Sequence, residues 1–253
     1  MRVIARMDIK GPNLIKGIRF EGLRVIGSPQ HFARHYYESG IDELLYVDTV
    51  ASLYGRNSLN DLLDFTAQNI FIPITVCGGI RSVEDVHLLL RAGADKVAIN
   101  TAAVKRPSLV EDVARAFGSQ CMVLSIEAKS VGGGRWEVYT DNGREHSGQD
   151  AVEWAMKAEK LGAGEILVTS VDHDGTRKGF DVGLIGAIVS VVGIPVIAGG
   201  GMGKPSHLIE LANKYPISAV AAGSALHYGN TTVLEIKRAL AANGIECRMS
   251  PSG

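Results

Sequence analysis

The sequence predicts a (β/α)8 barrel built from two duplicated halves, and three observations lead to this prediction. Eight short apolar runs alternate with amphipathic runs along the 253 residues, the links between them are short, and several motifs recur about half a chain apart. Regular alternation of this kind is typical of a parallel barrel. We expect one domain over residues 1–253, since barrels of this length usually form a single domain. A doubly wound sheet is the alternative, but it usually has fewer strands.

Each apolar run predicts one strand, because strands that are covered on both faces are apolar almost throughout. We place the first strand near residues 2–8 and the last near residues 218–222. The runs themselves cover residues 2–9, 43–48, 72–77, 96–100, 121–127, 165–170, 194–199 and 217–223.

The segments between the runs predict helices. In residues 82–93 and 231–244 the apolar side chains share one helical face, and each segment ends at a glycine, which often terminates a helix. One connection differs. Residues 136–148 read as a β-hairpin with Asn142 and Gly143 as its turn, since Asn-Gly is a strong hairpin signal.

The composition excludes several classes of function. A net charge of −1 indicates neither a nucleic-acid partner nor an anionic membrane. No apolar run approaches the length of a membrane span, so we expect a cytoplasmic protein. The three cysteines form no CxxC pair and no histidine pattern has metal spacing, so we expect neither a metal site nor a cofactor.

Two strand ends carry an acid at equivalent places. "MDIK" places Asp8 at the end of the first strand, and "IEAK" places Glu127 at the end of the fifth. These strands face each other across a barrel, and barrel active sites lie at the C-terminal strand ends. Singly, each acid is better explained as a partner for loop amides or the neighbouring lysine. Their twofold placement favours a catalytic pair for general acid–base chemistry.

Two glycine-rich strand ends are also duplicated, at residues 77–80 and 199–203. Each is followed one strand later by a small polar segment, residues 100–102 and 223–225. Bare backbone amides beside a helix start form an anion cradle. Two such cradles half a barrel apart predict a substrate with a phosphate at each end. Asp174 could bond a sugar hydroxyl, although Asp-Gly is also an ordinary turn.

Four charged residues begin strands at the opposite, N-terminal end of the predicted barrel. Solvated strand starts would be the ordinary explanation for them. Side chains that turn inward would instead form a ring of alternating charge on the barrel floor. The four residues are Arg2, Glu43, Lys96 and Glu165.

Several longer motifs resemble one family over essentially the whole chain. "KVAINTAAV", "FGSQC", "GAGEILVTS", "DHDGT" and "GIDELLYVD" are similar to the cyclase subunit of imidazole glycerol phosphate synthase, the HisF family of histidine biosynthesis. The resemblance implies a barrel of duplicated half-barrels. It also implies a lyase that joins ammonia to a bisphosphorylated ribulosyl formimino-carboxamide nucleotide. The products would be imidazole glycerol phosphate and an aminoimidazole carboxamide ribotide.

The resemblance further implies a partner and a set of roles. A HisH-type glutaminase subunit would form a heterodimer at the N-terminal barrel face and supply ammonia through the barrel. Asp8 and Glu127 would be catalytic, and the four charged strand starts would form a gate on the ammonia path. Substrate and phosphate binding would fall to Lys16, Gly79, Asn100, Thr101, Asp174, Gly175, Gly201 and Ser224.

Three departures from the family pattern lie near the predicted chemistry. Glu127 replaces an aspartate, Arg6 replaces a cysteine and Cys77 replaces a glycine. Because side chains alternate along a strand, we expect Arg6 to point away from Glu127. We expect the changes at Arg6, Cys77 and the first loop to reposition Glu127 or the substrate, so that cyclase activity is kept.

Three other functions are weighed against the cyclase. A divergent member could use channelled ammonia to build an acetamidino group on a surface-glycan sugar. The related phosphoribosyl isomerase would use two acids and no ammonia, but the charged strand starts and "FGSQC" argue against it. A non-catalytic barrel that only docks a glutaminase is disfavoured, since Asp8 and both cradles are present.

Overall fold

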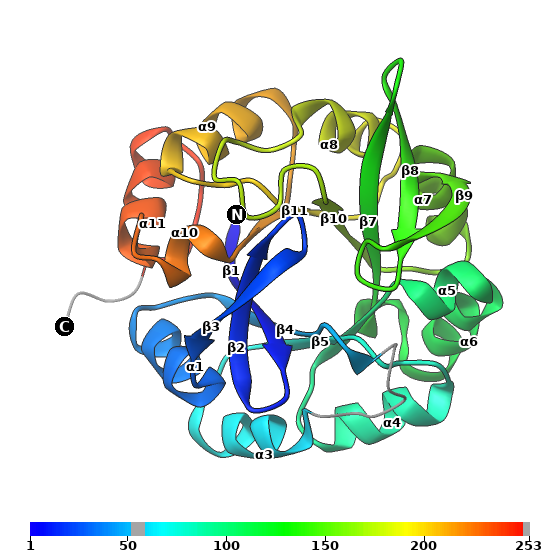
Figure 1. Cartoon of the computed structure of the whole chain (residues 1–253), viewed down its shortest axis with the longest axis horizontal. Coiled ribbons are helices and arrows are strands. Elements are labelled where there is room, and N and C mark those ends of the chain that lie inside the picture. The colour runs from blue at the N-terminus through cyan, green and yellow to red at the C-terminus, as the bar shows by residue number, and fades with distance from the viewer. Residues whose placement is uncertain (52–58, 250–253) are drawn as a thin grey trace.

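The computed structural model describes residues 1–51 and 59–249, and these form a closed barrel of eight parallel strands ringed by helices (Figure 1). Neighbouring strands pair in parallel, and the β7–β10 and β12–β1 pairings complete the closure. The predicted barrel is therefore confirmed over the alternative of an open sheet. Its strands are β1 Arg2–Lys10, β4 Glu43–Asp48, β5 Ile74–Cys77, β6 Lys96–Ile99, β7 Met122–Gly132, β10 Glu165–Ser170, β11 Val196–Gly199 and β12 Ala219–Ala222.

Helices cover the outside of the barrel. Two of them begin with a capping box, Ser82 with Asp85 and Thr232 with Glu235. A glycine with positive φ follows each of these two helices, as the sequence predicts. The helices are α1 Pro29–Glu38, α3 Asn60–Asn69, α4 Val83–Arg91, α5 Thr101–Lys105, α6 Ser108–Phe117, α7 Ala151–Lys160, α8 Val182–Val189, α9 Pro205–Lys214, α10 Ser224–His227 and α11 Val233–Ala242, with a short 3-10 turn at Ser119–Cys121.

The apolar core has two parts, and strand alternation separates them. The larger part fills the layer between strands and helices, where β1 contributes Val3, Ala5 and Met7. The smaller part lies inside the barrel, where β1 contributes Ile4. Because residues two apart on a strand share a face, the inward face of β1 continues from Ile4 to Arg6 and Asp8. The remaining interior residues are Leu45, Val47, Cys77, Ala98, Val123, Leu167, Ile197, Ala219 and Ala221.

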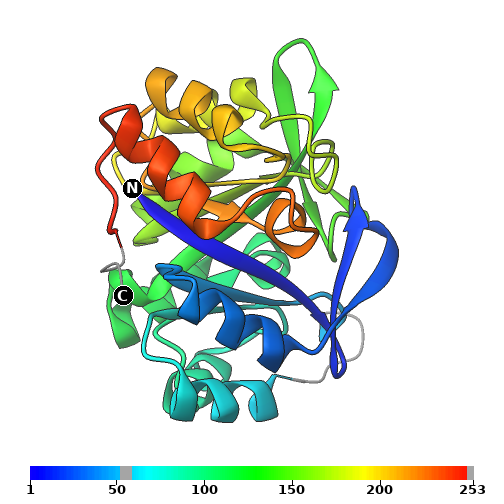
Figure 2. The ribbon, with the colours of Figure 1, turned by 90° about the vertical axis from the view of Figure 1, so that its left-hand side faces the viewer.

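Two hairpin segments extend from the C-terminal end of the barrel, residues 13–27 in blue and the end of β7 with β8 (Arg135–Thr140) in green (Figure 2). Beside the green projection, β8 joins β9 (Glu145–Asp150) in a further hairpin. It confirms the predicted hairpin, and its turn places Asp141, Asn142 and Gly143 at positive φ.

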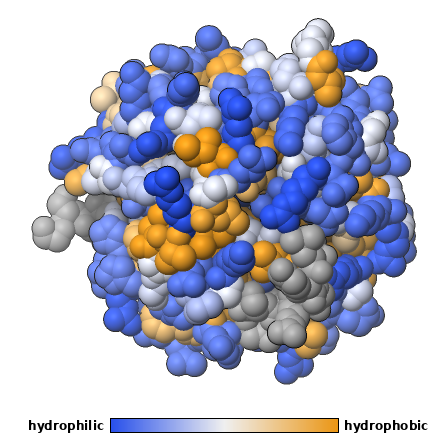
Figure 3. All heavy atoms as spheres, in the orientation of Figure 1, coloured by the Kyte–Doolittle hydropathy of each residue, from blue (hydrophilic) through white to orange (hydrophobic). Residues whose placement is uncertain are grey.

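The other hairpin joins β2 (Asn13–Ile18) to β3 (Glu21–Gly27) and follows β1 directly. The sequence prediction treated this segment only as a first loop. Apolar side chains gather over this hairpin on the face that Figure 3 shows. Two apolar side chains of the hairpin, Ile18 and Val25, are 58% and 65% exposed. Among the described residues, no helix combines the length and apolar character needed to cross a membrane.

Candidate active site at the C-terminal mouth

The two predicted acids lie opposite each other at the mouth of the barrel. Asp8 is on β1, and Glu127 is on β7, the fifth barrel strand counted from β1. Both residues are buried, with exposed fractions of 4% and 6%. The predicted juxtaposition of strands one and five is therefore present in the fold.

Asp8 is held by two cations. Its Oδ1 accepts a hydrogen bond from Nε of Arg6 at 2.8 Å, and its Oδ2 accepts one from Nζ of Lys16 at 2.6 Å. Lys16 also donates to Oδ2 of Asp174 at 2.8 Å. Burial alone would raise the pKa of Asp8, but Arg6 and Lys16 outweigh it and hold this pKa well below its usual range. Asp8 is therefore an anion at neutral pH.

Glu127 has different surroundings. Its Oε2 is buried and has no hydrogen-bond partner within the described structure. Burial raises the pKa of Glu127 to about 7, against the opposing attraction of Arg6 and the backbone amide of Gly143. A carboxyl group that is half ionised near neutral pH can both give and take a proton.

Arg6 does not point away from Glu127, so that expectation was wrong. Arg6 lies two residues before Asp8 and therefore on the same, inward face of β1. Its Nη1 donates to Oγ1 of Thr169 on β10 at 3.0 Å, so the guanidinium spans part of the barrel interior. The charge of Arg6 acts on Glu127 as well as on Asp8.

The first predicted cradle forms a cavity of about 220 Å³ beside Glu127. Gly79, Asn100 and Thr101 all line it, and Gly79 has a φ of 73°. The amide of Asn100 donates to the Tyr139 carbonyl at 2.9 Å, while its Oδ1 is buried and has no partner among the described residues. The structure thus joins these three residues and Glu127 in one cavity. Two cations not singled out from the sequence, Arg81 and Lys105, also line it.

The second predicted cradle is more dispersed. Gly175 and Lys16 line a separate cavity together with Arg24 and Arg177. Gly201 and Ser224 line neither this cavity nor the first one.

Close backbone contacts surround these residues. A side chain at Gly201 would overlap the carbonyl of Gly179, so the loops after β10 and β11 pack tightly. The hydroxyl of Ser224 is buried at the start of α10 and has no described partner.

His227 is a further mouth residue that the sequence argument missed. Its Nδ1 lies 2.6 Å from the hydroxyl of Tyr36. Burial lowers the pKa of His227 to about 4, and nearby Lys16 contributes. A single histidine without a motif gives no sequence signal for such a position.

Within residues 1–51 and 59–249, no group of three or more His, Cys, Asp or Glu side chains could hold a metal ion.

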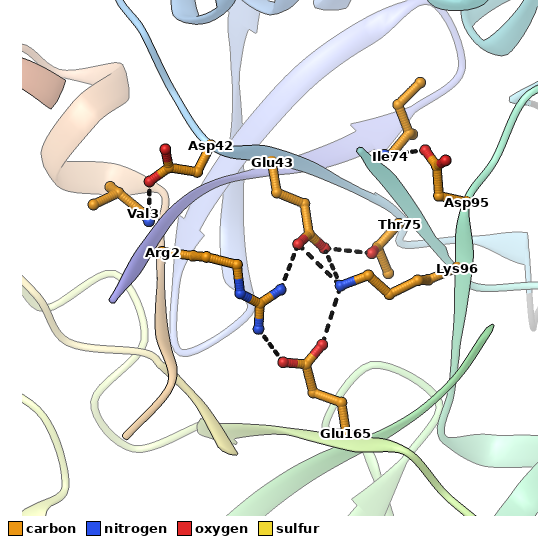
Figure 4. Close-up of polar contacts among 9 residues, drawn as sticks. All are labelled: Arg2, Val3, Asp42, Glu43, Ile74, Thr75, Asp95, Lys96 and Glu165. Carbon is orange, nitrogen blue, oxygen red and sulfur yellow. Dashed lines mark hydrogen bonds and ion pairs between the residues drawn. The ribbon is translucent and has the colours of Figure 1, made fainter. Parts of the chain in front are cut away.

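The charged strand starts close a ring at the opposite end of the barrel (Figure 4). Arg2 donates to Glu43 at 2.7 Å and also to Glu165. Lys96 lies 3.0 Å from Glu43 and 3.1 Å from Glu165. The four side chains therefore alternate in charge around the floor and turn inward, as the second of the two sequence interpretations predicts. We call these four residues the floor ring.

The fold, together with the residues at the mouth and at the floor of the barrel, defines a (β/α)8-barrel protein with an enzyme-like site at its C-terminal mouth. The chain matches the family described as "Histidine biosynthesis protein" over residues 2–232. It is similar to proteins named "Imidazole glycerol phosphate synthase subunit HisF" from three organisms. The one from Legionella pneumophila is 67% identical over 204 residues, which cover 81% of this chain and 96% of that protein.

The other two relatives cover nearly all of both chains. The Bacillus cereus protein is 47% identical and the Pyrococcus furiosus protein 50% identical, each over 248 residues, which are 98% of this chain and 98% of the relative. The chain therefore belongs to the histidine biosynthesis protein family and, within it, to the HisF proteins.

Proposed function

We propose that this protein is the cyclase subunit of imidazole glycerol phosphate synthase, an ammonia-dependent lyase of histidine biosynthesis. Its substrate is the bisphosphorylated ribulosyl formimino-carboxamide nucleotide, and its products are imidazole glycerol phosphate and aminoimidazole carboxamide ribotide. The observation that carries the proposal is the facing pair of buried carboxylates, Asp8 and Glu127, at the mouth of a barrel of this family.

The binding roles follow from the two sides of the mouth. A phosphate at the first cradle would meet Gly79, Asn100 and Thr101, with Arg81 and Lys105 supplying positive charge. The attached sugar would then lie next to Glu127, which lines the same cavity. We assign the second phosphate to the side that carries Gly175, Gly201 and Ser224. Lys16 and Asp174 lie between that side and Asp8.

The proposed partner is a glutaminase subunit of the HisH type, bound at the N-terminal face in a heterodimer. Two observations support it: the HisF relatives are named as subunits, and the floor ring lies at that face. Beyond the ring, part of the interior is lined by an apolar cluster that includes small side chains such as Ala98, Ala219 and Ala221. Neutral ammonia enters such a region more readily than ammonium does, because burying a charge is costly. A cytoplasmic location stays a prediction.

The other sequence-based hypotheses gain no support. The relatives are named for imidazole glycerol phosphate synthase, and none of these names refers to sugar amidination or to an isomerase. The non-catalytic hypothesis does not explain why Glu127 lines a cavity with an oxygen that no described residue bonds.

The test is turnover of the histidine-pathway bisphosphate with ammonia as the nitrogen donor. Wild type should turn it over, and Glu127→Gln and Asp8→Asn should each lose most of the activity. Glu127→Asp should keep part of it, because it retains an ionisable group. Absence of turnover by the wild type would contradict the proposal. Equal rates for wild type and Glu127→Gln would remove Glu127 from the mechanism.

A further inference from the structure

Asp8 and Glu127 occupy equivalent places but have unequal partners, and Arg6 is the side chain that makes the difference. We infer that Arg6 is a positioning residue that keeps Asp8 a permanent anion, so that Glu127 alone exchanges protons with the substrate. The inference rests on the proposed function for its catalytic meaning. It can nevertheless be tested on the free protein.

The contacts of Arg6 leave it little freedom. The side chain is 4% exposed. Its guanidinium donates to Asp8 and to Thr169, and it lies 5.3 Å from the ring centroid of Phe20 on the β2–β3 hairpin. A planar guanidinium can satisfy several acceptors in fixed directions at once, which a lysine ammonium cannot reproduce in the same geometry. These contacts therefore fix the position of the Arg6 guanidinium at the mouth of the barrel.

Asp8 uses both of its carboxylate oxygens in ion pairs. One pairs with Arg6 and the other with Lys16, and Lys16 is itself held by Asp174. Protonating Asp8 would weaken two charge-assisted hydrogen bonds and leave two buried cations short of a partner. The geometry therefore opposes proton uptake by Asp8, whatever substrate lies above it.

Glu127 can change its protonation state more easily than Asp8 can. It lines the cavity of the first cradle, and its Oε2 lacks a described partner. The groups whose charges act on it include Arg6 and Asp8 from β1, Asp174 from the loop after β10, and Cys77 from β5. The cavity that Glu127 lines also carries the charged side chains of Asp48, Arg81, Lys105 and Asp141. Burial raises the pKa of Cys77 to about 12, so its thiol is neutral.

Arg6 connects the two acids. It pairs directly with Asp8, and its second contact is Thr169, which lies opposite Glu127 in the parallel register of β7 and β10. Its attraction lowers the pKa of Glu127 against the effect of burial. Replacing Arg6 with a neutral side chain should therefore raise the midpoint of Glu127. Asp8 would then have Lys16 as its only described cation.

The first experiment titrates the side-chain carboxyl groups of the ligand-free protein by ¹³C NMR between pH 5 and 9. Spectra of Glu127→Gln and Asp8→Asn identify the two resonances. In the wild type, Glu127 should titrate near neutral pH and Asp8 should not titrate. In Arg6→Met the midpoint of Glu127 should move upward, and in Arg6→Lys it should return part of the way. Arg115→Met, a matched change at an exposed arginine on α6, should leave both resonances unmoved.

The second experiment follows ammonia-dependent kcat and KM against pH. Arg6→Met should lower kcat on the order of 10-fold at neutral pH, with a smaller change in KM. It should also shift to higher pH the limb of the kcat–pH profile that reports the ionisation of Glu127. A merely structural Arg6 would lower the amount of folded enzyme without moving that limb.

Two results would overturn the inference: titration of Asp8 between pH 5 and 9 in the wild type, or an unchanged Glu127 midpoint in Arg6→Met. If Arg6→Met does not fold, Thr169→Val supplies the second test, since it removes one contact of Arg6 and should move the Glu127 midpoint. An unmoved midpoint in that variant would equally overturn the inference. Failure of the proposed function would appear separately, as an absence of turnover beside the expected NMR titrations.

Discussion

Glu43 and Glu165 face each other across the barrel floor and share the same two partners, Arg2 and Lys96. The two acids are equivalent in the duplicated halves, since "DELLYVD" and "GEILVTS" align there. The two cations come from β1 and β6, which are not equivalent strands. The acids therefore follow the internal repeat, whereas the bases that close the ring do not.

Lys96→Met should lower turnover with glutamine as the nitrogen source more than turnover with added ammonia. Without Lys96, Glu43 and Glu165 have Arg2 as their one remaining cation in the floor ring, so the ring opens on one side. In the complex with a glutaminase, glutamine-dependent turnover should fall several-fold more than turnover with added ammonia. The measurement is the ratio of the two rates, with Arg115→Met as the surface control. Equal losses for both donors would exclude a role of the ring on the ammonia path.

Glu127 should make the stability of the protein depend on pH in a defined direction. Its pKa is raised from an ordinary 4.5 to about 7, so the folded protein binds more protons than the unfolded chain in that window. The free energy of unfolding therefore falls as pH rises from about 4.5 through about 7. Glu127→Gln removes this contribution. The difference in free energy of unfolding between Glu127→Gln and wild type should therefore change by on the order of 1–3 kcal/mol in favour of the variant as pH rises from 5 to 8. Urea denaturation of both proteins at several pH values measures this, and parallel curves would contradict the prediction.

Gly79→Ala should weaken phosphate binding at the first cradle. The φ of Gly79 is 73°, where a side chain costs about 1–2 kcal/mol of strain, and the residue lines the cavity. Gly133→Ala is the matched control, because Gly133 has a φ of 62° in the β7–β8 turn with nothing close to its missing side chain.

Both alanine variants should lose comparable stability in thermal melts. Only Gly79→Ala should bind inorganic phosphate more weakly in calorimetry. Crystals soaked with phosphate should also show an ion at this cradle and another near Gly201 and Ser224. Phosphate at only one of the two cradles would count against a bisphosphate substrate.

Lys237→Met should destabilise the fold without touching the mouth. The ammonium of Lys237 is buried on α11 and donates to Asp42 at 2.6 Å and to the carbonyls of Gly40 and Arg248 at 2.7 Å each. Its loss removes the buried cation of Asp42 and leaves this acid with Arg248, at 3.1 Å, as its remaining described cation, so the cost is up to about 3–5 kcal/mol. Lys214→Met, at an exposed lysine, should change the unfolding free energy by less than about 0.5 kcal/mol. Similar denaturation midpoints for the two variants would refute this prediction.

The strands and the acid pair could be predicted because they depend on local pattern. Apolar runs identify strands that are covered on both faces, and the duplicated motifs fix which strand ends lie opposite each other. The positions of Asp8 and Glu127 follow from those two facts. The inward turn of the floor ring was one of two open interpretations, since a charge at a strand start can face either way.

The environment of the acids could not be predicted, because it depends on segments distant in sequence. Asp8 meets Lys16, and Lys16 meets Asp174, only after the hairpin and the loop beyond β10 have folded over the mouth. The direction of Arg6 was predictable in principle. The error lay in placing Arg6 off the inward face, although it stands two residues before Asp8. The strands of the β2–β3 hairpin were missed because their outer side chains are exposed and the apolar pattern is weak.

The β2–β3 hairpin, residues 13–27, supplies both Lys16 to Asp8 and Phe20 to Arg6. The acidity of a barrel-strand residue is thus partly encoded in a rim segment outside the eight barrel strands. Grafting this hairpin onto a related barrel would transplant half of the electrostatic setting of the first acid and leave the strands unchanged. Diversification within such a family can therefore retune its proton chemistry by exchanging one surface segment, while the inherited scaffold stays the same.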